Sequence, residues 1–191
     1  MKYKIGVFGS GGKKLEGTGV QDLAKQIGKA LGKHSNDIIV ITGGCSGLPY
    51  IAAAEASAAG ADVWGYSPMQ NMEQQKEFTP TDDLSIYTEL KFIPSDLPIA
   101  NEKRKCMKYR NVLSTADCDA GIIIAGQWGS LNEFTNLVDM QKIAGVLTGS
   151  GGMADLIPGL AEKINKPGQG EIVFDPDPTH LVETLLQKLT V

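Results

Sequence analysis

The 191 residues of the chain are 42% hydrophobic and 21% charged, with a formal net charge of -4 at pH 7, a composition that is ordinary for a globular protein. The acidic balance, with Lys103-Arg104-Lys105 as the one basic cluster, argues against a nucleic-acid partner, and no apolar run is long enough to cross a membrane. Three widely spaced cysteines and two histidines predict neither a zinc site nor a disulfide framework, so we expect a cytoplasmic protein without a metal.

The amino-terminal half of the chain alternates short apolar runs with segments of helical spacing. Apolar runs that end in glycine predict buried strands, and apolar residues three and four positions apart predict helices. The first run ends in glycines without the cleavage pattern of a signal peptide, so we interpret it as a strand. The predicted elements are strands at residues 3–8, 37–42 and 61–66 and helices at residues 20–31 and 47–59.

The same alternation continues after a polar stretch at residues 67–84, which we predict to be a long loop. The remaining predicted strands are at residues 85–92, 118–125, 146–148 and 171–174. The remaining predicted helices are at residues 99–115, 130–144, 153–164 (interrupted by Pro158) and 179–189. This order predicts a single α/β domain over residues 1–191, a Rossmann-like doubly wound parallel sheet with helices on both faces.

Three predicted strands end in glycine-rich turns, where ligands of such sheets bind. Glycine lets the backbone approach an oxyanion closely, and the following helix offers unpaired N–H groups. The turns match neither the nucleoside-triphosphate loop nor Gly-x-Gly-x-x-Gly. They favour a nucleotide-type ligand, although any fold of this class needs glycine turns. The candidate binding residues are Gly9, Ser10, Gly43, Gly44, Gly47, Gly126, Gln127, Gly129 and Ser130.

Several segments together resemble a known family. They are Met107-Lys108-Tyr109-Arg110-Asn111, Ala116-Asp117, the apolar run Ile122-Ile123-Ile124 and Gly126-Gln127-Trp128-Gly129-Ser130-Leu131-Asn132-Glu133. This pattern resembles the LOG (Lonely Guy) family, whose members are often labelled "possible lysine decarboxylase" and whose relatives include molybdenum-cofactor carrier proteins. The resemblance covers nearly the whole chain.

The resemblance implies hydrolysis of the N-glycosidic bond of purine nucleoside 5′-monophosphates, cytokinin nucleotides especially, to the free base and ribose 5-phosphate. The family signature is Pro-Gly-Gly-x-Gly-Thr-x-x-Glu, and this chain has Ala125, Gln127 and Ser130 in place of Pro, the second Gly and Thr. Asn111 stands where the enzymes commonly have Lys. These departures leave open a non-catalytic carrier of a nucleotide or a pterin cofactor. Neither interpretation requires a further cofactor, and the resemblance implies a homodimer or larger homo-oligomer through the helices at 99–115 and 130–144.

Arg110 and Glu133 are the candidate catalytic residues under this resemblance, with Met107 and Asn111 as nucleotide contacts. A carboxylate beside an anomeric carbon stabilises an oxocarbenium-like state or activates water, and Arg orients the substrate or binds its phosphate. Two simpler interpretations stay open: Ser130 and Glu133 have capping-box spacing, and Arg110 alone would suit a surface ion pair.

Lysine decarboxylation is not expected in this chain. Pyridoxal phosphate requires a Schiff-base lysine with acidic partners. Lys13 and Lys14, the only lysines that adjoin a glycine turn, have loop residues on either side.

Overall fold

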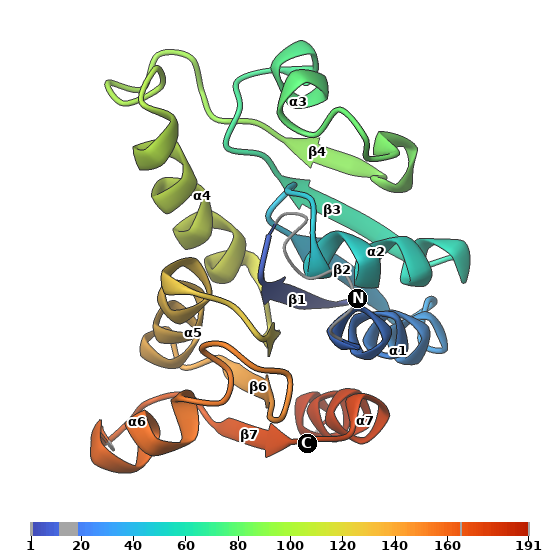
Figure 1. Cartoon of the computed structure of the whole chain (residues 1–191), viewed down its shortest axis with the longest axis vertical. Helices are drawn as coiled ribbons and strands as arrows, with labels where there is room; N and C mark the ends of the chain where they lie inside the picture. The colour runs from blue at the N-terminus through green and yellow to red at the C-terminus, as the bar shows by residue number, and fades with distance from the viewer. Residues whose placement is uncertain (1, 12–18, 165, 191) are drawn as a thin grey trace.

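The computed structural model describes residues 2–11, 19–164 and 166–190, which form a parallel sheet with helices on both faces (Figure 1). Gly12, Lys13 and Lys14 lie outside the described residues. The strands are β1 (Tyr3–Gly9), β2 (Ile38–Thr42), β3 (Asp62–Tyr66), β4 (Glu89–Lys91), β5 (Ala120–Ile124), β6 (Ile143–Leu147) and β7 (Ile172–Asp175). The predicted Rossmann-like α/β fold is confirmed.

The strand order places a switch point in the middle of the sheet. The order is β4-β3-β2-β1-β5-β6-β7, so the chain extends the sheet to one side from β1 and to the other side from β5. β1 and β5 pair in parallel through residues 5–9 and 120–124. In open parallel sheets, the crevice at the carboxyl ends beside such a switch point is where ligands bind.

Two apolar layers attach the helices to the sheet. The layer containing Ile5 and Val7 packs against α1 (Val20–Gly32), α2 (Leu48–Ala58) and α7 (Pro178–Leu189). The layer containing Phe8 and Ile123 packs against α5 (Trp128–Asp139) and α6 (Ile157–Ile164), with α4 (Lys103–Asp117) beside them. Successive strand residues point to opposite faces, so a strand covered on both sides must be apolar throughout, as β5 is. None of the described helices has the length and apolar character to span a membrane.

The predicted loop at 67–84 is wrong in part, because it contains the helix α3 (Met72–Phe78) and the start of a 3-10 turn at Leu84–Ile86. The buried residue of α3 is a glutamine, Gln75, so the segment lacks the apolar spacing that identifies a helix. The predicted strand at 85–92 is shorter in the structure, because its first residues belong to this 3-10 turn and only β4 is a strand.

Three predicted helices differ from the structure at their ends. The predicted helix at 130–144 is wrong at both ends: α5 begins at Trp128, it ends at Asp139, and residues 143–144 belong to β6. The predicted helix at 99–115 begins only at Lys103, after a series of turns. The helix at 153–164 begins at Ile157, and Pro158 lies in its first turn, where a missing N–H has no cost, so Pro158 does not interrupt it.

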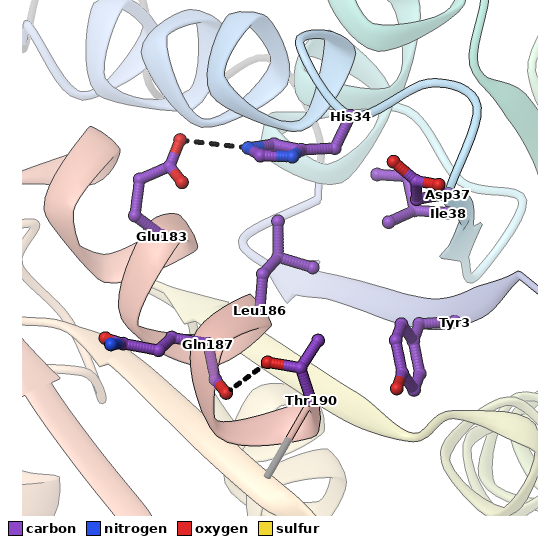
Figure 2. Close-up of a pocket in the computed structure, with 8 residues that line it drawn as sticks. All are labelled: Tyr3, His34, Asp37, Ile38, Glu183, Leu186, Gln187 and Thr190. Atoms are coloured by element: carbon purple, nitrogen blue, oxygen red, sulfur yellow. Dashed lines mark hydrogen bonds and ion pairs between the residues drawn. The ribbon is translucent and has the colours of Figure 1, made fainter.

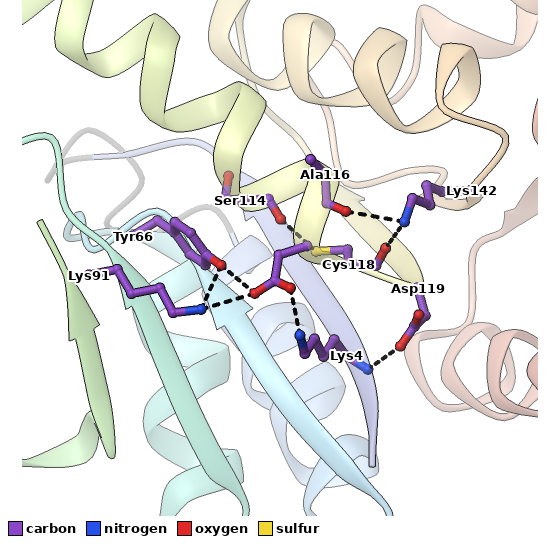
Figure 3. Close-up of polar contacts among 9 residues, drawn as sticks. Lys4, Tyr66, Lys91, Ser114, Ala116, Cys118, Asp119 and Lys142 are labelled. Carbon is purple, nitrogen blue, oxygen red and sulfur yellow. Dashed lines mark hydrogen bonds and ion pairs between the residues drawn. The ribbon is translucent and has the colours of Figure 1, made fainter. Parts of the chain in front are cut away.

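A polar cluster fixes the carboxyl end of α4 to the sheet (Figure 3). The Asp117 carboxylate accepts hydrogen bonds from Lys4 Nζ (2.5 Å), from Lys91 Nζ (3.1 Å) and from the Tyr66 hydroxyl. Burial by itself raises the carboxyl pKa of Asp117, but these hydrogen bonds hold it below its usual value. The cluster fixes the position of α4, and α4 carries Arg110 two turns before Asp117.

Candidate functional site

The three predicted glycine turns follow β1, β2 and β5, which are neighbours in the sheet. Ser10, in the first turn, connects them. Its carbonyl oxygen accepts from Leu48 N (3.0 Å) at the start of α2, and its Oγ accepts from Gly126 N (2.9 Å) after β5. Ser10 therefore joins the three turns at the carboxyl ends of the strands, beside the switch point.

Two of the predicted binding glycines are required by contacts within the protein. A Cβ on Gly9 would lie 2.4 Å from the Ile124 carbonyl oxygen, and a Cβ on Gly43 would lie 1.5 Å from Arg110 Nη1. Gly44 and Gly47 have φ values of 59° and 110°, which glycine adopts without strain. Close packing and backbone conformation are thus sufficient to explain these four glycines, and Gly43 in particular makes room for the Arg110 guanidinium.

The start of α5 exposes unpaired backbone donors. Gln127 is the N-cap residue, and its carbonyl oxygen accepts the first intrahelical bond from Leu131 N (3.0 Å). The amides of Trp128, Gly129 and Ser130, called the α5 amides below, therefore have no partner within the helix. Gly129 is exposed, and a Cβ there would meet no atom of the described residues within 4 Å. Unlike Gly9, Gly43 and Gly126, it is not required by packing.

The capping-box interpretation of Ser130 and Glu133 is wrong. Ser130 is the third residue of α5 rather than its cap, and Gln127 provides no side-chain cap. Both Ser130 and Glu133 are buried, with 2% and 6% of their surface exposed. A Cβ on Gly126 would lie 2.3 Å from Ser130 Oγ, so that hydroxyl lies against the turn before the helix.

Arg110 and Glu133 form a buried ion pair between α4 and α5. Arg110 Nη1 lies 3.5 Å from Glu133 Oε1, and only 7% and 8% of the two side chains are exposed. The interpretation of Arg110 as a surface ion pair is therefore wrong. Arg110 Nη2 donates to Cys45 Sγ at 3.5 Å, and Arg110 Nε is buried without a partner in the described part of the chain. A buried guanidinium whose Nε has no partner among the described residues, and whose other contacts are long, can donate to a further oxygen ligand.

Burial raises the pKa of Glu133 to about 7, even though the charges of Arg110 and Lys108 lower it. A carboxyl group with this pKa is present in both protonation states near neutral pH, which suits general acid–base catalysis. Asn111 lies beside it. In one orientation of its amide, Asn111 Nδ2 donates to Asn132 Oδ1 (3.1 Å), and in the flipped orientation it donates to Glu133 Oε1 (3.2 Å) and to the Met107 carbonyl oxygen (2.9 Å).

The other predicted contacts differ in exposure. Met107 is half-buried, one turn before Arg110 on α4. Gln127 and Trp128 are exposed at the start of α5, with 76% of Trp128 accessible. The Trp128 side chain is therefore not part of the hydrophobic core. No group of three or more metal-ligating side chains occurs among the residues that the structure describes, and the expectation of no metal stays a prediction.

Two features of the site were missed by sequence analysis. Cys45 lies beside Arg110, and burial raises the pKa of its thiol, so the thiol stays protonated. A fourth glycine turn, Gly149-Ser150-Gly151-Gly152, follows β6 and packs against Ala125 and Gly126. Its glycines come directly after a predicted strand, the same signal that identified the other three turns.

A separate cavity of about 380 Å³ lies at the opposite edge of the sheet, between the end of α1 and α7 (Figure 2). His34 Nε2 and Glu183 Oε1 lie 3.0 Å apart on its rim, and Leu186 and Tyr3 line it. None of the predicted site residues contributes to this cavity, and it lies at the amino ends of the strands. The candidate site is therefore the region where Arg110 and Glu133 lie near the α5 amides, and not this cavity.

A sequence model of the SLOG cluster4 family matches residues 2–181. The chain belongs to this family. The predicted resemblance to LOG proteins and molybdenum-cofactor carriers is thereby confirmed at the level of the family. No curated protein sequence matches this SLOG cluster4 chain closely enough to count as a relative.

Solved structures share the SLOG cluster4 chain's fold over most or all of its length. TM1055 has 20% identity and a TM-score of 0.74, covering 98% of this chain and 99% of its own. The molybdenum cofactor carrier protein of Chlamydomonas reinhardtii has 17% identity and a TM-score of 0.69, with 100% of both chains covered. DNA processing protein A of Helicobacter pylori, described as binding single-stranded DNA, has 20% identity and a TM-score of 0.65, covering 97% of this chain and 81% of its own. These similarities show the fold, and the expectation of no nucleic-acid partner stays a prediction for this chain.

Proposed function

We propose that this protein binds a purine nucleoside 5′-monophosphate and hydrolyses its N-glycosidic bond, releasing the free base and ribose 5-phosphate. The observation that supports this most directly is the buried pair of Arg110 and Glu133, 3.5 Å apart, beside the α5 amides. A helix N-terminus binds phosphate through free N–H groups and its dipole. A buried carboxyl with a pKa of about 7 suits the reaction at the sugar.

Each group has a role in this reaction. The bond from the anomeric carbon to the base breaks through an oxocarbenium-like state, and water supplies both the hydroxyl of ribose 5-phosphate and the proton of the released base. The ionised Glu133 carboxylate stabilises the cation or takes the proton of the attacking water. Arginine is a hydrogen-bond donor and a poor general acid, so Arg110 orients the phosphate or the ribose through its N–H groups rather than transferring a proton.

Glu133→Gln tests the reaction. The amide keeps the size of the side chain but cannot carry negative charge or accept the proton, so we expect the rate of base release from AMP to fall by about 100-fold or more. Chromatography of the free base measures the rate, and calorimetry measures the affinity for AMP, which should change little. Glu162→Gln on the exposed surface of α6 is the control. Base release at an unchanged rate in Glu133→Gln would exclude this mechanism.

A second candidate function is non-catalytic binding of a nucleotide or a phosphate-bearing pterin. It is favoured by Gln127, which has an exposed side chain and directly precedes the α5 amides. The LOG enzymes have a glycine at this position. The two functions are distinguished by turnover: a carrier shows calorimetric binding of AMP or a pterin phosphate without base release. Neither function requires a further cofactor in this proposal.

Gly129→Ala tests whether the α5 amides bind phosphate. A Cβ at this helical position meets no atom within 4 Å in the part of the chain that the structure describes, so alanine should raise the free energy of unfolding by up to about 1 kcal/mol. If phosphate approaches these amides, the same methyl group should weaken AMP binding by about tenfold or more. Chemical denaturation and calorimetry measure the two effects. A variant that is more stable and binds AMP as the wild type does would place the phosphate elsewhere.

The assembly proposed from the family resemblance is a homodimer or larger homo-oligomer through the helices predicted at 99–115 and 130–144, which correspond to α4 and α5. Val112 is an exposed apolar residue of α4, with 41% of its surface accessible. Sedimentation velocity of the wild type and of Val112→Lys measures the assembly. A smaller species in the variant supports this interface, and an unchanged oligomer places the contact on other helices.

A further inference from the structure

The turn between β5 and α5 contains two consecutive residues in the left-handed conformation. Ala125 has a φ of 51° and Gly126 has a φ of 96°. Glycine adopts positive φ freely, but the Cβ of alanine makes this region unfavourable, so a non-glycine residue stays there only when its surroundings hold it. The turn precedes α5 directly, and its conformation sets the direction in which that helix leaves the sheet.

All four backbone polar groups of Ala125 and Gly126 are bound by residues from other turns. Their partners are Ser150 Oγ for Ala125 N (2.8 Å), Ser10 Oγ for Gly126 N (2.9 Å), Ala154 N for Ala125 O (3.0 Å) and Met153 N for Gly126 O (2.9 Å). Three of these four partners lie in the segment 150–154, after β6. This segment therefore encloses one side of the turn.

Ser150 is suited to this contact by its own hydrogen bonds and burial. Its hydroxyl donates to the Leu147 carbonyl oxygen (2.5 Å), which leaves its lone pairs to accept from Ala125 N. Only 7% of Ser150 is exposed. A Cβ on Gly152 would lie 2.5 Å from the Gly126 carbonyl oxygen, so glycine at 152 permits the close approach.

We infer that Ser150 is a positioning residue of the candidate site, which holds Ala125 in its left-handed conformation and thereby sets where α5 presents its free amides and Glu133 to Arg110. Its importance for catalysis rests on the proposed function, but its control of the turn does not. Proline at 125 is incompatible with this arrangement, because proline has no N–H to donate and its φ is fixed near -65°. The chain therefore has an alternative way of fixing a turn in which the LOG signature has proline.

Ser150→Ala tests the control of the turn by amide hydrogen exchange. We expect the exchange of the Ala125 amide to accelerate by about tenfold, because the amide loses its acceptor, while the amide of Ile123 within β5 keeps its protection. Ser114→Ala, which removes another buried hydroxyl, from α4, is the matched control and should leave the Ala125 amide unchanged. Equal protection of Ala125 in the wild type and in Ser150→Ala would overturn the inference.

The consequence for the site is tested with AMP. In Ser150→Ala we expect base release to slow by about tenfold at saturating AMP, with a shifted pH midpoint of the rate, because Glu133 moves relative to Arg110. Adding Ala125→Gly should restore most of the rate, since glycine holds the positive φ without help. A slower rate that this second change does not restore would make Ser150 merely structural and would contradict the inference.

The outcomes also separate this inference from the proposed function. If the wild type releases no base, the proposed hydrolysis fails, and the exchange of the Ala125 amide alone decides the role of Ser150. Ala125→Pro provides a further check, because it removes both the N–H and the left-handed conformation. An Ala125→Pro variant that folds and acts like the wild type would show that the turn does not depend on Ser150.

Discussion

At the scale of single residues, the buried Arg110 guanidinium in the candidate site has few close hydrogen bonds to the described residues. Most buried charged groups have several close hydrogen bonds, but among the described residues Arg110 has one weak contact to sulfur, a 3.5 Å approach to Glu133 and an Nε without a partner. Removing one partner from a buried pair of this kind costs about 3–5 kcal/mol, and the pair itself contributes little net stability because both charges are desolvated. A ligand oxygen that binds the free donors would add stability, which is the expected property of a binding site.

The raised pKa of Glu133 predicts a specific dependence of stability on pH. Burial raises this pKa from 4.5 to about 7, so between these values the folded protein keeps a proton that the unfolded chain has released. The free energy of unfolding contributed by Glu133 is therefore fully present below pH 4.5, falls as the pH rises toward about 7, and levels off above it.

Glu133→Gln removes this dependence. Relative to the wild type, the variant should gain stability as the pH rises from 4.5 to about 8, by about 3 kcal/mol in total, because a shift of one pKa unit corresponds to about 1.4 kcal/mol. Urea unfolding at a series of pH values measures the difference. Glu162→Gln should follow the wild-type curve in parallel. A constant difference between Glu133→Gln and the wild type across this range would contradict the raised pKa.

At the scale of helices and strands, apolar spacing predicted the elements that pack through apolar side chains. It missed the helix α3, which is attached through the polar side chain of Gln75. The apolar pattern of α5 continues past its end, because Leu137, Val138 and Ala144 fit one helical face. The helix nevertheless stops at Asp139, and Gln141 adopts a φ of 59° where glycine would be the usual signal. Nothing in the residue type of Gln141 identifies this reversal, so the boundary between α5 and β6 was not predictable from the sequence.

The helix α3 was missed for a related reason, and its attachment yields a prediction. Gln75 is fully buried, and its amide donates to the Gly44 carbonyl oxygen (3.0 Å) and to Thr79 Oγ1 (2.9 Å), while its Oε1 accepts from Ser67 Oγ (2.5 Å). These bonds fasten α3 to the glycine turn after β2. Gln75 makes the buried contact that an apolar residue usually makes in a helix. The sequence of α3 therefore lacks the apolar residues at helical spacing that would predict a helix.

Gln75→Ala should lower the free energy of unfolding by about 2–3 kcal/mol, because it removes three buried hydrogen bonds and creates a cavity. Urea unfolding measures the loss. Lys76→Ala, at the neighbouring exposed position of the same helix, should change stability by less than about 0.5 kcal/mol. If both variants were equally stable, α3 would be held by contacts other than this network.

At the scale of the whole molecule, the sequence was sufficient to predict the fold and to bring the candidate residues to one edge of the sheet, but not to predict the contacts between them. Alternating strands and helices specify a parallel sheet, and parallel strands bring their carboxyl ends, with the glycine turns, to one edge. The spacing between Arg110 and Glu133 does not specify their 3.5 Å contact, which depends on how α4 and α5 pack. Likewise, Ser150 reaches Ala125 only because β6 lies beside β5.

Charge is unevenly distributed over the molecule. The chain has a net charge of -4, yet α4 presents Lys103, Arg104, Lys105 and Lys108 to solvent on the helix that carries Arg110. Lys108 is close enough to Glu133 to lower its pKa, so it lies near the candidate site. A local basic surface on an acidic protein attracts a phosphate ligand from solution, and salt weakens the attraction because the Debye length falls from about 10 Å at 0.1 M to about 3 Å at 1 M.

We therefore expect the affinity for AMP to fall as sodium chloride rises from 0.05 to 0.5 M, an experimental range chosen to shorten the Debye length about threefold. Lys108→Gln should weaken AMP binding at low salt by about three- to tenfold, reduce this salt dependence, and raise the pKa of Glu133 further, which moves the pH midpoint of base release upward. Lys33→Gln, at the end of α1, is the matched control and should leave all three unchanged. Identical salt dependence in the two variants would mean that the basic surface of α4 does not attract the ligand, and would leave Arg110 and the α5 amides as the sole phosphate contacts in this proposal.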